Sequence, residues 1–518
     1  MCKKINFLRM RMRAKSPRRR EGAGRTVNSG MGSVVVIRRD REPRASPARP
    51  ISYAGTMPAR DESSGDHSAA ASAAGLDPAR DAAIRRLARQ AHRYPDVEPG
   101  GPKTQGLGER DAAFAHAIYD AAMRRLLTIT AIVSPYLRTP FAELEPRAKG
   151  VLLAGAAQIL FLDRVPAHAV LNESVEWAKR VIRPGMGAMV NAVLRRVAEL
   201  REGATVEARP WTGSGSDLPR SDGTVLKLPA RVLLGDEWEV IARATSHPTP
   251  MIRRWSRMCG DPKTREIALH SLVEAPVVLN AEHATSPVAW DGLTFVPHDR
   301  PGFFVVEGPH ATVGAFLHAR RDVWAQDTSS ARAVASVRDL VPRVVLDACA
   351  GRGTKTRQLA AIFPNARIIA TDSDRARLVA LREATAHLAR VEVVEFEALA
   401  RMSGVADLVL LDVPCSNTGV LARRVEAKYR VAGPTGLHDI VPLQRRIVAS
   451  ACPLLAPGGA ILYSTCSVEP EEDEDQVRAL ASEHRLGLRR EDKNLPSGVP
   501  GGPATSYADG SYSALLVT

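Results

Sequence analysis

Residues 343–356 read RVVLDACAGRGTKT, an apolar run that leads straight into a turn with two glycines. A second apolar run, ARIIATD (366–372), follows after a segment long enough for a short helix. Two more runs, VEVVEF (391–396) and DLVLL (407–411), continue the alternation. Strands that alternate with helices indicate a parallel, doubly wound sheet. The sequence therefore predicts a Rossmann-like α/β domain over residues 322–518.

Acidic residues stand at the ends of these predicted strands. Asp372 closes the second strand, and Glu397 and Asp412 follow the third and fourth. Because the carboxyl ends of parallel strands meet at one edge of a sheet, these acids and the glycine turn should line one crevice. An acid at the end of the second strand suits the two hydroxyls of a ribose, so we expect a nucleoside cofactor.

The cofactor that fits this crevice best is S-adenosylmethionine, because its sulfonium is cationic and the nearby carboxylates supply a negative field. NAD or FAD is the alternative. The turn lacks a third glycine at dinucleotide spacing, which counts against a dinucleotide.

Two cysteines follow further strand-like runs. Cys415 lies in DVPCSNTGV (412–420), and Cys466 lies in YSTCSVEPEE (463–472). Two thiols at two strand ends could face one pocket. A thiolate that adds to carbon 6 of a pyrimidine makes carbon 5 nucleophilic enough to accept a methyl group. The pair therefore predicts pyrimidine C5 methylation, in which one cysteine forms the covalent bond and the other assists proton handling and release.

The composition limits which classes of protein this chain can belong to. The chain has 518 residues and 45% apolar content, enough for two or three cores. Its six cysteines include no CxxC pair, which argues against a zinc site or a disulfide framework and favours reduced thiols in the cytoplasm. We interpret Cys2, Cys259 and Cys452 as small apolar side chains. The longest apolar run, GVLLAGAAQILFL (150–162), is too short for a membrane span and predicts a buried helix.

The net charge of +14 indicates a polyanionic partner, but most of it lies at the front. Residues 1–75 hold 16 Lys or Arg against 6 Asp or Glu. Without helical or strand periodicity, this tail (1–76) is expected to be disordered. It is either a basic RNA-binding arm or an extension from an over-long start, with Met31 and Met57 as later candidates.

The middle of the chain divides by periodicity and composition. Apolar residues recur at helical spacing over 77–202, which predicts an all-α domain. A Gly-, Ser- and Pro-rich segment at 203–245 reads as a linker or surface insertion. Two short helices and three short strands are expected over 246–321, a small α+β lobe.

Several of these motifs together resemble a known family. They are ILFLDRVPAHAVLNESVEWAK (159–179), MVNAVLRR (189–196), WAQDTSS (324–330), DACAGRGTKT (347–356) and the two cysteine motifs. On these residues the chain resembles the RsmB-type (Fmu/Sun) 16S ribosomal RNA cytosine-5 methyltransferases over 77–518, with a NusB-like RNA-binding domain in front. The resemblance implies a class I methyltransferase domain at 322–518, a ribosomal RNA substrate and a monomer without metal.

The resemblance also implies roles for individual residues. Cys466 would be the nucleophile, Cys415 would promote release, and Asp412 would orient the base. The implied cofactor-binding residues are Cys349, Ala350, Gly351, Arg352, Gly353, Thr354, Lys355, Asp372, Glu397 and Asp412. In the basic stretch ARRVEAKYR (422–430), the expected RNA contacts are Arg423, Arg424 and Lys428. Arg195 and Arg196 are either phosphate contacts or part of a solvated helix face.

The sequence departs from the family pattern in the cofactor turn. Gly351-Arg352-Gly353-Thr354 replaces the usual Ala-Pro-Gly-Gly, and Glu397 replaces an Asp. Two other functions remain open. One is a methyltransferase with a different target atom, which would need neither thiol; the other is a non-catalytic RNA-binding or assembly factor with a degenerate methyltransferase domain.

Overall fold

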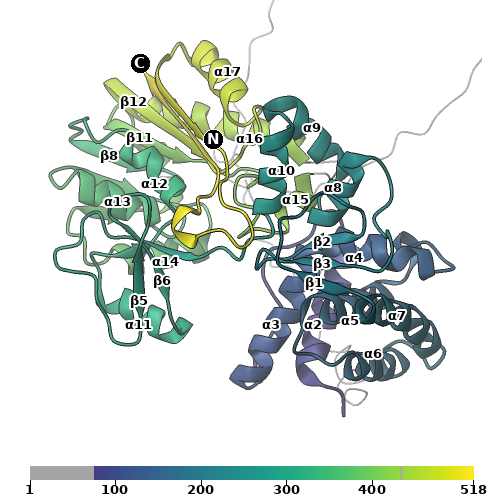
Figure 1. The fold of residues 1–518 in the computed structure, drawn as a ribbon. Coiled ribbons are helices and arrows are strands. Elements are labelled where there is room, and N and C mark those ends of the chain that lie inside the picture. Colours follow the sequence, from purple (N-terminus) through teal and green to yellow (C-terminus); the bar gives the residue numbers. More distant parts are fainter. Residues whose placement is uncertain (1–74, 432, 434–435) are drawn as a thin grey trace, which may run out of the picture. The chain divides into compact units, whose positions relative to one another are not determined.

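The computed structural model describes residues 75–431, 433 and 436–518, and Figure 1 shows their arrangement. The predicted basic tail at 1–76 lies outside the described residues, except for its last two positions. The described helices and strands all belong to one connected unit, Ser72–Thr518.

The front of the described chain is helical, as its periodicity predicts. Its α-helices are α2 (Pro78–Arg93), α3 (Glu109–Arg124), α4 (Leu126–Val133), α5 (Pro146–Phe161), α6 (Ala167–Val181) and α7 (Met186–Glu202), with the short turns η1 (Ser134–Tyr136) and η2 (Phe141–Glu143). Helix α5 is the buried one, since every residue from 150 to 160 is buried. Among the described helices, none has both the length and the apolar character to cross a membrane.

Helices α2 and α5 approach each other most closely at Gly150. A Cβ atom at this position would lie 2.8 Å from both the amide nitrogen of Ala88 and the carbonyl oxygen of Ile84 in α2. Any side chain would therefore push the two helices apart, so this contact requires glycine.

The segment predicted as a linker or surface insertion is folded. It forms β1 (Thr205–Glu207), β2 (Asp217–Pro219) and β3 (Val225–Lys227), an antiparallel sheet of order β1-β3-β2, followed by α8 (Glu237–Thr245). Leu218, Leu226 and Leu228 join the core of the helical domain. Strands of three residues are too short to show an alternating pattern, which is why composition pointed to a loop.

The next segment is the expected small α+β lobe. It contains α9 (Thr249–Cys259), α10 (Asp261–His270), β4 (Val277–Asn280), β5 (Thr294–Pro297), β6 (Phe303–Glu307), α11 (His310–Ala319) and β7 (Trp324–Ala325). Its strands form an antiparallel sheet of order β5-β6-β4-β7.

The last segment confirms the doubly wound domain. Its strands are β8 (Val344–Asp347), β9 (Arg367–Ala370), β10 (Val391–Val393), β11 (Ala406–Asp412), β12 (Leu455–Thr465), β13 (Gly487–Asn494) and β14 (Ser511–Val517). They form one sheet of order β10-β9-β8-β11-β12-β14-β13, parallel as far as β12 and antiparallel beyond it. The order reverses between β8 and β11, so the crevice for a ligand is expected at the carboxyl ends of these two strands.

Helices cover both faces of this sheet (Figure 1). They are α12 (Thr328–Ala335), α13 (Thr354–Ile362), α14 (Arg375–Thr385), α16 (Gly436–Ala451) and α17 (Glu474–His484). The same segment also contains α15 (Ala427–Val431), which packs with the elements before the sheet, and the short turns η3 (Phe396–Arg401), η4 (Cys452–Leu454) and η5 (Ala504–Ser506). Along β11, Leu408 and Leu410 pack with residues of α12 and α13, whereas Val409 and Leu411 pack with residues of α16 and α17. This alternation fixes which strand residues face each layer.

Helix α15 inserts into the core of the helical domain. The hydroxyl of Tyr429 donates to the carbonyl oxygen of Met123 at 2.6 Å and lies 2.9 Å from Oγ of Ser246. From the other side, Nη1 of Arg124 donates to the carbonyl oxygens of Ser271 at 2.8 Å and Ala422 at 3.0 Å. The chain after the Cys415 motif is therefore held by the front domain and by the small lobe.

Replacing Tyr429 by Phe should destabilise the protein by about 1–2 kcal/mol, because the carbonyl of Met123 loses a buried hydrogen-bond donor while the ring packing stays. Urea unfolding followed by tryptophan fluorescence would measure this loss. The matched control is Tyr136→Phe, since Tyr136 is exposed. Equal unfolding midpoints for the two variants would show that the Tyr429 hydroxyl contributes nothing at this junction.

Candidate active site

The glycine turn after β8 needs a left-handed backbone at both of its glycines. Gly351 and Gly353 have φ angles of +58° and +88°, in the left-handed region. A Cβ atom at Gly353 would also lie 2.9 Å from Cδ1 of Leu381. The turn therefore needs glycine at position 353, both for its backbone conformation and for the close approach of α14. Helix α13 begins at the next residue, Thr354.

Asp372 ties this turn to the end of β9. One carboxylate oxygen accepts the N–H of Gly351 at 2.9 Å, and the other accepts the N–H of Asp374 at 2.8 Å. Only 6% of Asp372 is exposed. Glu397, by contrast, lies on η3 and is exposed. The structure thus places the second-strand acid against the turn and leaves the third acid facing solvent.

Asp347 lies directly beneath the turn and is fully buried. Its Oδ2 accepts the hydroxyl of Thr356 at 2.7 Å, whereas Oδ1 has no hydrogen-bond partner among the described residues. Burial raises the pKa of Asp347 to about 7. Because Asp347 is fully buried, Asp372 and the glycine turn carry the fit to a nucleoside: a carboxylate at the end of the second strand can accept from ribose hydroxyls. Sequence reasoning missed Asp347.

The structure brings the two predicted thiols into contact. Strands β11 and β12 pair in parallel, with Asp412 opposite Ser464, and a cysteine follows the end of each strand. The Sγ atoms of Cys415 and Cys466 lie 3.1 Å apart, and both residues are partly exposed free cysteines. The amide N–H of Cys466 also points to Sγ of Cys415 at 3.4 Å.

Asn417 completes this thiol pair, although sequence reasoning did not identify it. Its Oδ1 lies 3.4 Å from Sγ of Cys466, and its Nδ2 donates to the carbonyl oxygen of Cys415 at 2.8 Å. The residue has a φ angle of +63°, which asparagine tolerates better than most side chains. The loop thus turns back so that one side chain contacts both cysteines.

A lysine and a carboxylate lie beside the thiols. Nζ of Lys355 donates to Oδ2 of Asp412 at 2.9 Å and to Oγ of Ser330 at 3.3 Å. Burial disfavours the ammonium form, but the charges of Asp412 and Cys466 outweigh burial and raise the pKa of Lys355. Hydrogen bonding to Cys466, followed by burial, raises the pKa of Cys415 well above its usual range. Cys415 is therefore held as a thiol at neutral pH.

The remaining residues predicted to bind the cofactor in this turn differ in how far they are buried. Ala350 is buried, Cys349 is partly buried, and Arg352 is exposed. Burial, together with the charge of Asp347, raises the pKa of Cys349 far above neutrality, so this third thiol does not ionise in the native protein.

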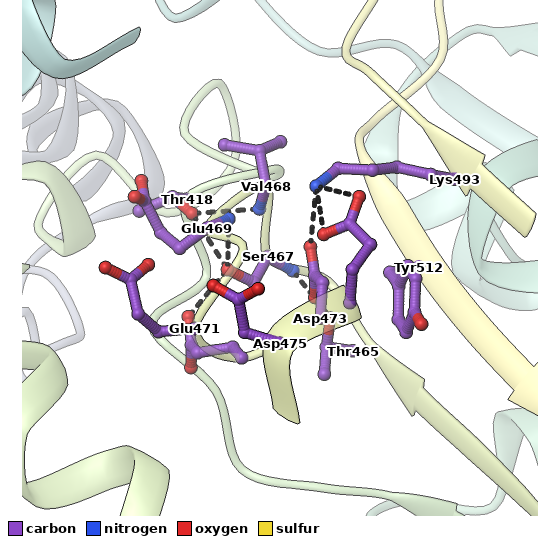
Figure 2. A network of polar contacts seen from close by, with 12 residues as sticks. Thr418, Thr465, Ser467, Val468, Glu469, Glu471, Asp473, Asp475, Lys493 and Tyr512 are labelled. Carbon is purple, nitrogen blue, oxygen red and sulfur yellow. Dashed lines mark hydrogen bonds and ion pairs between the residues drawn. The ribbon is translucent and has the colours of Figure 1, made fainter. Parts of the chain in front are cut away.

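Polar contacts fix the chain after Cys466, as Figure 2 shows. The hydroxyl of Thr465 donates to Oδ1 of Asp473 at 2.6 Å, and Nζ of Lys493 lies 3.3 Å from Oδ2 of Asp473. The hydroxyl of Thr418 accepts the N–H of Val468 at 3.1 Å, which links the two cysteine motifs. These contacts hold the turn that carries the second thiol.

Glu469 connects this turn to the small lobe. One carboxylate oxygen accepts Nε1 of Trp255 at 3.0 Å, and the other accepts Nε of Arg254 at 2.7 Å. Both partners come from α9, so the lobe supports the active-site turn directly.

The predicted RNA contacts that follow the first cysteine motif differ in how far they are exposed. Nε of Arg423 donates to Asp509 at 2.8 Å, and the side chain of Arg423 is 32% exposed. Arg424 is 56% exposed. Lys428 is fully buried, and its ammonium donates to the carbonyl oxygens of Arg124 at 3.0 Å and Thr245 at 3.2 Å. A buried ammonium offers nothing to a polyanion, so the structure contradicts an RNA contact by Lys428.

Arg195 and Arg196 lie on α7 of the helical domain and are exposed. The guanidinium of Arg196 lies 2.8 Å from the carboxylate of Glu199. They are far along the chain from the thiols, and their use as phosphate contacts stays a prediction.

Known proteins resemble this chain over most of its length. A model described as 16S rRNA methyltransferase RsmB/F matches residues 340–504, and a NusB family model matches residues 78–199. Ribosomal RNA small subunit methyltransferase B of Erwinia tasmaniensis is 27% identical over 440 residues, which cover 84% of this chain and 96% of that protein. The same enzyme of Vibrio cholerae is 27% identical over 430 residues, 80% of this chain and 91% of its own.

A crystal structure of PH0851 aligns with a TM-score of 0.61 and 20% identity, covering 85% of this chain and 99% of that one. At this identity the likeness concerns the fold alone.

Replacing Asp347 by Asn should change how stability depends on pH. The native carboxyl holds its proton up to about pH 7, whereas an unfolded Asp loses it near pH 4, so the unfolding free energy of the wild type falls across this window and stays reduced above it. Asn carries no such penalty. We expect the melting temperature of the variant, relative to wild type, to be higher at pH 8 than at pH 5.

The matched control is Asp339→Asn. Arg490 lowers the pKa of Asp339 to about 2, so any effect of this replacement should be constant above pH 5. If the two variants show the same pH dependence between 5 and 8, the raised pKa of Asp347 is refuted.

Proposed function

Because the chain belongs to the RsmB/F family of S-adenosylmethionine-dependent rRNA cytosine methyltransferases, with a NusB-family domain in front, we propose that it methylates carbon 5 of a cytosine in 16S rRNA. The observation that carries the proposal is the contact between the thiols of Cys415 and Cys466 beside the Lys355–Asp412 pair. The names of the relatives supply the small-subunit RNA as the substrate class.

We assign the nucleophile to Cys466. The resemblance to the family gives this role to the cysteine of the Thr-Cys-Ser motif, which is Cys466 here. The raised pKa of Cys415 keeps that side chain protonated, which suits a hydrogen-bond donor rather than a nucleophile.

The reaction then runs through carbon 6. The thiolate of Cys466 adds to this atom and converts the ring to an enamine, whose carbon 5 takes the methyl group. Loss of the carbon 5 proton to water restores the double bond and expels the sulfur of Cys466 as a thiolate. The S–H of Cys415, 3.1 Å away, can donate a hydrogen bond to this leaving sulfur.

Asp412 is the residue that would orient the cytosine. Its carboxylate stands at the end of β11 and can accept a hydrogen bond from the exocyclic amino group of the base, and the ammonium of Lys355 holds this carboxylate in place. A base in a duplex cannot reach this site, so the target is expected in a single-stranded or loop region.

S-adenosylmethionine supplies an electrophilic methyl group when it is bound. Asp372 and the turn at 351–353 would hold its ribose and methionyl parts. The front domain would position RNA through the phosphates, with exposed Arg195 and Arg196 as candidate contacts.

The two cysteines should give opposite phenotypes. Cys415→Ala removes the donor to the leaving sulfur, so a covalent enzyme–RNA adduct should accumulate and appear as a shifted band on a denaturing gel. Cys466→Ala should show neither adduct nor 5-methylcytosine. Cys452→Ala, which lies in η4, is the matched control and should behave as wild type. Methylation by the Cys466 variant would refute the nucleophile and favour a different target atom.

Asp372→Ala should weaken S-adenosylmethionine binding by roughly tenfold or more, because two backbone donors and the ribose lose a shared acceptor. Isothermal titration of wild type and variant would measure it, with Asp374→Ala as a neighbouring control. A wild-type chain that binds no S-adenosylmethionine would instead favour an assembly factor. Bisulfite sequencing of 16S rRNA from cells without the gene would then name the cytosine, or show that none is lost.

A further inference from the structure

Three hydroxyl groups lie behind the two thiols and connect their loops. Ser416 directly follows Cys415, and Ser467 directly follows Cys466. Oγ of Ser416 lies 3.1 Å from Oγ of Ser467, and Oγ1 of Thr418 lies 3.2 Å from both. Whatever fixes these hydroxyls also fixes the backbone next to each sulfur.

The carboxylate of Glu472 is the acceptor that the two loops share. Its Oε1 accepts the N–H of Ser416 at 2.8 Å and Nε2 of Gln444 at 3.0 Å. Its Oε2 accepts the hydroxyl of Ser467 at 2.6 Å and the hydroxyl of Ser416. In addition, the carbonyl oxygen of Glu472 accepts the hydroxyl of Tyr463 in β12 at 2.8 Å.

This carboxylate is fully buried, and within the described part of the chain its hydrogen-bond donors are all neutral. Burial raises the pKa of Glu472, so its position depends on keeping all these donors in place. The charge of Glu472 is also one of the causes that raise the pKa of Cys415.

We propose that Glu472 is a positioning residue for the two-thiol reaction: by bridging the loops through Ser416 and Ser467, it sets the separation of the Cys415 and Cys466 sulfurs. The role rests on the proposed function but concerns a geometry that exists without RNA or cofactor. Glu472 reaches no reacting atom itself. A displacement of about 1 Å at reacting groups can lower a rate about 100-fold, so such a bridge matters to the reaction.

The direct test uses phenylarsine oxide, whose arsenic bonds to two neighbouring thiols and releases one water. Wild type should bind one equivalent through Cys415 and Cys466, and Cys415→Ala should lose this binding. Glu472→Ala should weaken it at least about tenfold. The control Glu471→Gln, on the same turn but with a 41% exposed side chain, should bind as wild type.

The conservative variant separates geometry from charge. In Glu472→Gln the amide oxygen can still accept from Ser416 and Gln444, and the amide nitrogen can donate to the serine hydroxyls. It should therefore restore arsenical binding. Because it removes a negative charge near Cys415, the pH at which Cys415 ionises should fall, and the pH profile of adduct release should move with it.

Activity provides the second readout. Glu472→Ala should lower kcat about 100-fold while the KM for RNA stays within about threefold, since the RNA-binding surface is untouched. Ser467→Ala removes the hydroxyl that donates to Glu472 and should also weaken arsenical binding. This variant takes the place of Glu472→Ala if Glu472→Ala does not fold. Wild-type arsenical binding by either variant would overturn the proposal. Because arsenical binding needs no methyl transfer, it is informative even if the wild type methylates no RNA.

Discussion

The parallel pairing of β11 with β12 is the constraint on which the rest of the site depends. Asp412 stands opposite Ser464, so the chain leaves both strands at the same level and the two cysteines that follow come into contact. A slip of one residue would exchange the side chains that face α12 and α13 with those that face α16 and α17. The hydrophobic layers on either side of the sheet therefore bring the two strand ends to one level, and the polar contacts behind the cysteines hold the loops that carry the sulfurs.

The order of strands and helices and the two cysteine motifs could be predicted from the sequence. The run at 343–349 and the two-glycine turn predicted β8 and a helix from about Lys355, because buried parallel strands are short and apolar and glycine is needed at the turn. The strand ends two residues before the run does, at Asp347, and α13 begins at Thr354. The two cysteines were identified from their motifs. Their actual contact was not predictable from spacing, since it depends on a strand pairing between segments about 50 residues apart.

The burial of two charged residues could not be predicted from the sequence around them. Lys428 lies in ARRVEAKYR, a stretch that reads as a solvated basic surface, yet it is buried by α3 and α8, which come from distant parts of the chain. Glu472 sits in an acidic run in which nothing distinguishes it from Glu471. Burial separates the two, and burial is set by tertiary contacts that no local pattern encodes.

The insertion of α15 into the helical domain has a consequence for the evolution of the protein. Tyr429 and Lys428 complete the interior of the front domain, although they belong to the segment that follows the first cysteine motif. A chain cut down to its methyltransferase half would expose the ring of Tyr429 and the side chain of Lys428 to water. The two halves are thus no longer interchangeable modules: either can change only as far as the other accommodates it.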